Sequence, residues 1–173
     1  DSFYMMDQHA AHEKILYERL MKQFHEKTYH SQMIMPPVIL TLSLREEQIL
    51  KENWKTFTAL GYEIEEFGGK EYKVTGLPAE LPTVIDCKQL LIELIDTIAD
   101  ESATHDPERI TEKVASMSCK AAVKGNNRLS FKEAEELMRE LMEAENPYNC
   151  PHGRPTLIKM TKYEIERKFK RIL

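Results

Sequence analysis

Residues 7–27, DQHAAHEKILYERLMKQFHEK, predict a long amphipathic helix on which apolar and metal-ligand side chains share one face. Asp7 is a typical N-cap residue, and the apolar residues after it recur at helical spacing. A buried carboxylate is costly unless it is paired or bound to a metal, so a glutamate on the buried face favours a ligand role. The residues within one arc of about 100° on a helical wheel are His9, Glu13, Leu16, Tyr17, Leu20 and Phe24.

Two further segments carry side chains that bind metal ions. Residues 118–120 read SCK and residues 150–155 read CPHGRP. Zinc takes thiolate, imidazole and carboxylate ligands, and a histidine and a glutamate four residues apart on a helix aim at one point. The sequence therefore predicts a metal site, with either one crowded ion or two ions that share a bridging ligand. Its six candidate ligands are Asp7, His9, Glu13, Cys119, Cys150 and His152.

Size and composition limit the class of protein. A chain of 173 residues with 42% hydrophobic residues fits one domain or two small subdomains. No apolar run approaches the roughly 18 residues of a membrane span, so we expect no membrane partner. Three cysteines form an odd, sparse set, which favours a reducing compartment over a disulfide framework. The protein has a net charge of −5. If its substrate is DNA, another part of the protein or a partner must contribute to DNA binding, because DNA is itself negatively charged.

The periodicity along the chain predicts a mixed α/β (α+β) fold with two subdomains. Strands or extended segments are expected at residues 3–6, 29–42, 62–67, 71–75 and 156–160. Helices are expected at residues 7–27, 44–60, 86–99, 107–124 and 131–145, and after Thr161. Because the candidate ligands come from the two ends of the chain, we expect a discontinuous core subdomain of residues 1–37 and 110–173. Residues 38–109 are then an inserted helix-and-hairpin subdomain.

The ligand segments resemble the motifs of one family. Residues 7–18, DQHAAHEKILYE, resemble the DQHAxxExxxxE endonuclease motif of the MutL mismatch-repair family, and residues 150–155 match its CPHGRP motif. Residues 118–120 resemble its ACR-type motif with serine and lysine substituted, and residues 169–171 resemble its terminal FxR motif. These matches follow the family order and bracket nearly the whole chain. MutL proteins that rely on a separate nicking enzyme lack the DQHA motif, so the chain is similar to the C-terminal domain of the nicking type.

The resemblance implies a homodimeric domain with a metal-dependent endonuclease that nicks one strand of duplex DNA. It implies metal-binding roles for the same six residues. From the chemistry of phosphodiester hydrolysis, we expect Glu13 first and Asp7 second as a bridging or catalytically essential carboxylate. Glu18 matches the last glutamate of the motif, but it falls nearly opposite Glu13 on the wheel. Bound Zn²⁺ suits the thiolate and imidazole ligands, and activation by Mn²⁺ or Mg²⁺ suits the carboxylates.

The resemblance also implies partners. They are an ATPase region N-terminal to this domain in the same protein, other mismatch-repair proteins and the replicative sliding clamp, in a bacterial, nucleoid-associated cytoplasmic setting. Residues 32–37, QMIMPP, resemble the Q-x-x-[LI]-x-P peptide that binds the clamp, and a linker between subdomains is the alternative. The residues of this segment are Gln32, Met33, Ile34, Met35, Pro36 and Pro37. Candidates for phosphate contacts, or else solvated surface charges, are Lys120, Lys124, Arg128 and Arg154.

Two other functions stay open from the sequence. A non-catalytic, zinc-stabilised dimerisation and partner-binding module would keep every ligand, and it predicts a closed tetrahedral site. A hydrolase of small substrates would need a pocket signature such as a Gly-rich phosphate loop, which the sequence lacks. Additional apolar residues on the first helix, Ala11, Ile15 and Met21, favour dimerisation. Cys87 has no assigned role, and it is expected to be either an ordinary core residue or partly exposed.

Overall fold

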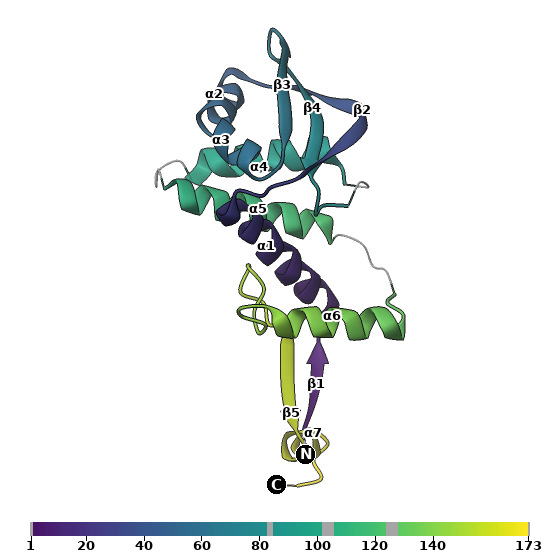
Figure 1. Ribbon diagram of the computed structural model, residues 1–173. Coiled ribbons are helices and arrows are strands. Elements are labelled where there is room, and N and C mark those ends of the chain that lie inside the picture. The colour runs from purple at the N-terminus through teal and green to yellow at the C-terminus, as the bar shows by residue number, and fades with distance from the viewer. Residues whose placement is uncertain (1, 83–84, 102–105, 124–127, 173) are drawn as a thin grey trace. The chain divides into compact units, whose positions relative to one another are not determined.

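The computed structural model describes residues 2–82, 85–101, 106–123 and 128–172. The chain forms two compact units: Asp1–Ile15 together with Asn126–Leu173, and Leu16–Gly125. Helix α1, Gln8–Glu26, begins in the first unit and ends in the second. Helices combined with small antiparallel sheets confirm the predicted α+β class (Figure 1).

The first unit is built around a two-stranded sheet and a helix. Strand β1, Ser2–Met6, pairs antiparallel with β5, Leu157–Thr161. Helix α6, Phe131–Glu143, and the short α7, Lys162–Lys168, each begin with a capping box, at Ser130 and at Thr161. Both caps follow from the local sequence, because a serine or threonine followed three residues later by glutamate satisfies two helix-end donors at once.

A small apolar core holds the first unit together. Leu137 and Leu141, one turn apart on α6, are buried with Ala11 and Ile15 of α1. Met21 is buried in the separate core of the second unit. The expectation that Ala11, Ile15 and Met21 favour dimerisation is therefore wrong, because each of the three packs inside its own unit.

The second unit is a three-stranded antiparallel sheet with helices. Its strands are β2, Ser31–Thr41, β3, Glu63–Gly68, and β4, Glu71–Pro78, in the order β2-β4-β3. Helices α4, Cys87–Glu101, and α5, Pro107–Ala122, lie one below the other beneath this sheet in Figure 1. Gly68 and Gly69 connect the expected strands 62–67 and 71–75, and both have positive φ, which glycine adopts readily.

Two of the expected element boundaries and the expected subdomain boundaries need comment. Residues 44–60 form two helices, α2, Leu44–Glu52, and α3, Trp54–Ala59, because Asn53 leaves helical geometry and its side chain donates to the Ile49 carbonyl at 2.9 Å. Residue 124, the expected end of α5, lies outside the described residues. The predicted subdomains, residues 1–37 with 110–173 and residues 38–109, divide the chain at other points than these units and stay a prediction.

Ser118, the serine of the SCK segment, has a structural role in the second unit. It is fully buried, and its hydroxyl donates to the Val114 carbonyl at 2.6 Å. Its oxygen lies 2.6 Å from the hydroxyl of buried Tyr62. Since a serine hydroxyl has one proton to donate, Tyr62 is the donor to Ser118. The serine therefore satisfies a buried tyrosine.

We predict that Ser118→Ala lowers the free energy of unfolding by about 1–3 kcal/mol, because the buried Tyr62 hydroxyl loses its acceptor. In the Ser118→Ala variant, a second substitution, Tyr62→Phe, should lower the free energy of unfolding little further, because it removes the tyrosine hydroxyl that has lost its acceptor. Urea unfolding of both single variants and the double variant measures this coupling. Losses that simply add in the double variant would contradict the assignment.

Candidate metal centre

The turn at residues 150–154 presents three polar side chains within five residues. The Cys150 carbonyl accepts from the Gly153 N–H at 2.9 Å, and the Cys150 N–H donates to the Arg154 carbonyl at 2.9 Å. Pro151 sets the backbone at the second turn position, and Gly153, with a φ of 78°, closes the turn. The sequence CPHGR therefore encodes its own rigid turn.

The start of α1 is fixed next to this turn by backbone contacts. The Asp7 N–H donates to the Thr156 carbonyl at 2.9 Å, and the Asp7 carboxylate accepts from the Ala10 N–H at 3.0 Å. Asp7 thus caps the helix, as predicted, and connects it to the residue that precedes β5. Glu13 follows within the first two turns of α1.

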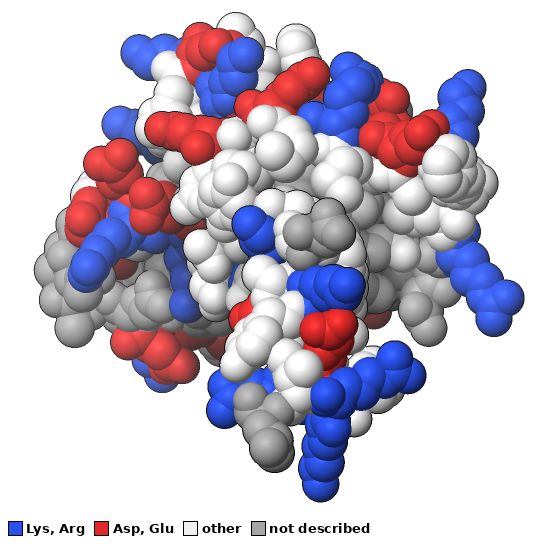
Figure 2. All heavy atoms as spheres, turned by 90° about the horizontal axis from the view of Figure 1, so that it is seen from below, with Lys and Arg blue, Asp and Glu red and all other residues white. Residues whose placement is uncertain are grey.

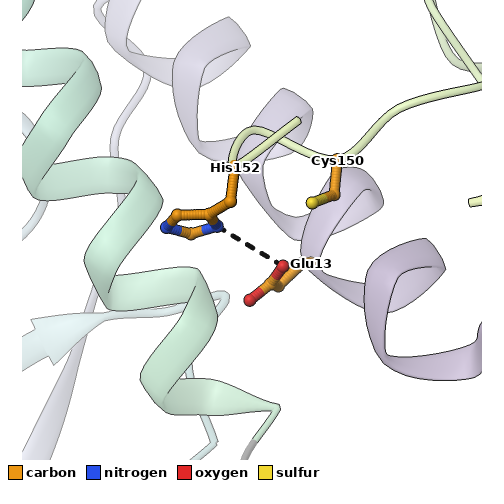
Figure 3. Close-up of side chains that lie close together, drawn as sticks. All are labelled: Glu13, Cys150 and His152. Carbon is orange, nitrogen blue, oxygen red and sulfur yellow. Dashed lines mark ion pairs between the residues drawn. The ribbon is translucent and has the colours of Figure 1, made fainter. Parts of the chain in front are cut away.

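Three of the six predicted ligands come together in the first unit. Glu13, Cys150 and His152 each offer a ligand atom, and these atoms lie within 4.8 Å of one another (Figure 3). His152 Nδ1 lies 3.5 Å from Glu13 Oε2. Glu13 and Cys150 are buried, whereas the His152 side chain is 29% exposed. A carboxylate, a thiol and an imidazole with one side open to solvent are a donor set that fits zinc with a remaining open position.

Arg154 contacts the carboxylate of this cluster. Its Nη2 lies 3.0 Å from Glu13 Oε1 and 2.8 Å from Glu13 Oε2. A hydrogen bond with the Cys150 side chain and then the charge of Glu13 raise the pKa of Arg154. The sequence suggested either a phosphate contact or a solvated surface charge for Arg154, and this ion pair was missed. The signal was present, because a buried carboxylate requires a counter-ion and Arg154 is close in sequence to two ligands.

The other three predicted ligands are not part of the cluster among the described residues. Asp7 is exposed and caps α1, and His9 is partly buried one turn before Glu13. Cys119 belongs to the second unit, where it is buried on α5. Cys119 acts on Tyr17 within the second unit. The pKa of Tyr17 is raised to about 12, first by burial and then by the charges of Glu112 and Cys119. Metal-binding roles for Asp7, His9 and Cys119 stay predictions.

The remaining charged candidates lie on the surface or beyond the description. Lys120 and Arg128 are exposed, and Lys124 lies outside the described residues. Glu18, the last glutamate of the first motif, is partly buried in the second unit. On the face in Figure 2, Lys and Arg side chains are mixed with Asp and Glu side chains. Phosphate contacts at these positions stay predictions.

Residues 32–37 form part of β2 in the second unit. The Gln32 amide donates to the Pro78 carbonyl at 3.0 Å and to the Leu81 carbonyl. The register of β2 against β4 shifts between Met33 and Val38, where Pro36 and Pro37 have no N–H to donate. Met33 and Met35 are largely exposed on this irregular stretch. The segment is thus anchored through Gln32, and it presents two methionines.

The exposed Met33 and Met35 help to line a pocket of about 520 Å³. Its lining includes Ile34, Leu77 and Cys87. Cys87 is buried, as expected for a core residue, and burial raises the pKa of its thiol to about 11. A thiol with a raised pKa is mostly protonated and therefore a poor nucleophile or metal ligand.

No helix in the described part of the chain combines the length and apolar character needed to cross a membrane.

Comparison with known proteins places the chain in a family. A family model described as the MutL C terminal dimerisation domain matches residues 1–129. The DNA mismatch repair protein MutL of Agathobacter rectalis is 52% identical over 173 residues, which are 100% of this chain and 26% of that protein. The MutL of Caldanaerobacter subterraneus subsp. tengcongensis is 39% identical over 172 residues, 99% of this chain and 29% of that protein.

The alignments with relatives also include the turn at residues 150–154, which lies beyond the family model. The MutL of Clostridium beijerinckii is 37% identical over 172 residues, 99% of this chain and 26% of that protein. The chain spans about a quarter of the length of the curated relatives that it matches. With three quarters of its residues matched by the family model, the chain belongs to the MutL C-terminal dimerisation domain family.

Proposed function

We propose that this chain is the dimerisation and metal-dependent endonuclease domain of a MutL protein, and that it nicks one strand of duplex DNA in mismatch repair. The cluster of Glu13, Cys150 and His152 carries this proposal. The membership of the chain in the MutL family and the DQHA and CPHGRP motifs support it. The ATPase region, other mismatch-repair proteins and a cytoplasmic location remain part of the proposal.

The donor set suits hydrolysis of a phosphodiester. A bound Zn²⁺, aided by Mn²⁺ or Mg²⁺, would supply Lewis-acid activation of a water and neutralise charge on the phosphate. Glu13 and Cys150 would offer a carboxylate and a thiolate to a bound ion in a buried place, where charges are little screened. The His152 side chain is partly exposed to solvent, so we expect water or a phosphate from solution to reach a bound ion on this side of the cluster.

We predict that Glu13→Ala in the full-length protein lowers Mn²⁺-dependent nicking of supercoiled plasmid by more than about 100-fold. Losing a group that only supports a metal ligand already costs 10–100-fold. Bound zinc should fall in parallel, and circular dichroism should show an intact fold. Glu26→Ala, another carboxylate on α1, is the matched control and should nick like the wild type.

If the Glu13→Ala variant nicks the plasmid as fast as the wild type, the catalytic assignment of Glu13 is refuted. If the wild type does not nick, yet zinc removal unfolds the domain or splits its dimer, the alternative of a zinc-stabilised dimerisation module holds instead.

One exposed face of the β1–β5 sheet supports homodimer formation. Residues paired across the two strands point to the same face, and the register pairs Met5 with Ile158 and Phe3 with Met160. This face is wholly apolar, and Phe3, Met5 and Ile158 are each more than two-fifths exposed. An isolated two-stranded sheet is marginally stable, and exposed apolar patches mark interfaces. A second copy of the chain is the partner that the family description suggests.

We predict that Ile158→Asp weakens the homodimer at least tenfold, because a tenfold change needs only about 1.4 kcal/mol and burial of an unpaired carboxylate costs more. Lys159→Asp changes the neighbouring residue on the opposite face, where Lys159 lies over the Tyr4 ring, and should leave the dimer intact. Sedimentation velocity over a range of concentrations measures both. If both variants weaken the homodimer equally, the effect comes from the added negative charge on β5 and not from the loss of this apolar face.

A second function, binding of the replicative sliding clamp, is favoured by the exposure of Met33 and Met35. Two flexible apolar side chains on an irregular strand can enter the groove of a partner. Gln32 is hydrogen-bonded to carbonyls of its own unit, so we assign it an anchoring role in the unbound domain.

We predict that the double substitution Met33→Ser and Met35→Ser weakens binding to the purified clamp by at least about tenfold, the equivalent of 1.4 kcal/mol. The melting temperature should stay unchanged, because both side chains are largely exposed. Surface-based binding assays with Met142→Ser, an exposed methionine of α6, provide the control. Unchanged clamp affinity of the double variant would remove this segment from the interface.

A further inference from the structure

One nitrogen of Arg154 serves both oxygens of the Glu13 carboxylate. Nη2 lies 3.0 Å from Oε1 and 2.8 Å from Oε2. In the fork-like pairing common between arginine and carboxylates, two nitrogens each take one oxygen. A single cationic nitrogen between both oxygens takes the position at which a carboxylate chelates a metal ion with both oxygens.

We propose that Arg154 is an internal competitor of the metal: it holds the Glu13 carboxylate in the metal-free protein and leaves when a metal ion binds. This inference rests on the proposed metal centre. It assigns to Arg154 a positioning role, in which the residue sets the metal affinity without being a ligand.

The two partners of this ion pair differ in their access to water. The Glu13 side chain is 3% exposed, whereas the Arg154 side chain is 52% exposed. An uncompensated buried carboxylate is unfavourable, so Glu13 requires a cation at all times. A half-exposed guanidinium can return to water at little cost. The exchange therefore replaces one cation by another on Glu13, and the released arginine remains hydrated.

The backbone of the turn permits this exchange without a change of fold. The Arg154 carbonyl is held by the Cys150 N–H at 2.9 Å, and the Gly153 N–H donates to the Cys150 carbonyl at 2.9 Å. These bonds fix the main chain from which Cys150, His152 and Arg154 project. Only the Arg154 side chain has to move. A released guanidinium next to the metal ligands would be available to a phosphate, which is one of the two roles that the sequence left open for Arg154.

Competition makes a prediction about affinity that differs from the effect of an ordinary supporting contact. Removing a supporting residue weakens metal binding, whereas removing a competitor strengthens it. We expect Arg154→Gln to bind Zn²⁺ at least about tenfold more tightly than the wild type, which corresponds to 1.4 kcal/mol. Competition with a chromophoric chelator at fixed pH and ionic strength measures this. Arg167→Gln on α7 removes the same charge elsewhere in the first unit and should not change the affinity.

Thermal unfolding with and without saturating Zn²⁺ provides a second readout. Because the ion pair exists only in the metal-free protein, Arg154→Gln should lower the melting temperature without metal and leave it unchanged with metal. An equal loss in both conditions identifies Arg154 as a structural contact and overturns the proposal. Unchanged or weaker Zn²⁺ affinity of the variant overturns it as well.

A variant that does not fold is replaced by Arg154→Lys, tested by the same two measurements. The ammonium of lysine is shorter in reach and more strongly hydrated, so it leaves the carboxylate more readily. Tighter Zn²⁺ binding is again expected, and unchanged or weaker binding overturns the proposal.

The Glu13→Ala variant separates failure of this inference from failure of the metal centre. If the wild type binds no Zn²⁺, or binds it equally after Glu13→Ala, the proposed centre fails and the inference fails with it. If Zn²⁺ binding depends on Glu13 but does not tighten in Arg154→Gln, the competitor role alone is refuted.

Discussion

The buried carboxylate of Glu13 is the constraint on which the first unit depends. A carboxylate that is almost wholly withdrawn from water requires a positive partner. The partner available in the chain comes from a turn near the other end of the sequence, where Arg154 meets both oxygens. The rigid turn, the capped start of α1 and the pairing of β1 with β5 all serve to keep these two distant segments in contact.

Short-range chemistry made much of the fold predictable. Asp7, Ser130 and Thr161 cap helices in the structure because each is followed by donors or acceptors within three residues. The glycine pair between β3 and β4 likewise turns the chain where the sequence indicates. The break at Asn53 was missed, since an asparagine within a helical pattern does not by itself reveal that its side chain will compete with the backbone.

Long-range contacts were the part that a single sequence could not supply. Arg154 and Glu13 are separated by 141 positions, and the Ser118–Tyr62 pair by 56. Motif resemblance pointed to Glu13, Cys150 and His152 together, which the structure then placed within one cluster. The sequence left Arg154 as either a phosphate contact or a solvated surface charge, and it assigned no role to Ser118. Both residues acquire their roles only from partners that folding brings to them.

The separation of Glu13 from its partners has a consequence for the order of events on the ribosome. The chain emerges N-terminus first, so β1 and Glu13 leave the ribosome before the turn at 150–154 and β5. Until then the carboxylate stays hydrated, and β1 lacks the strand with which it pairs in the structure. The nascent chain therefore carries β1 as an unpaired, apolar strand until β5 has emerged. Such a strand is a risk for aggregation and a natural ligand for a chaperone.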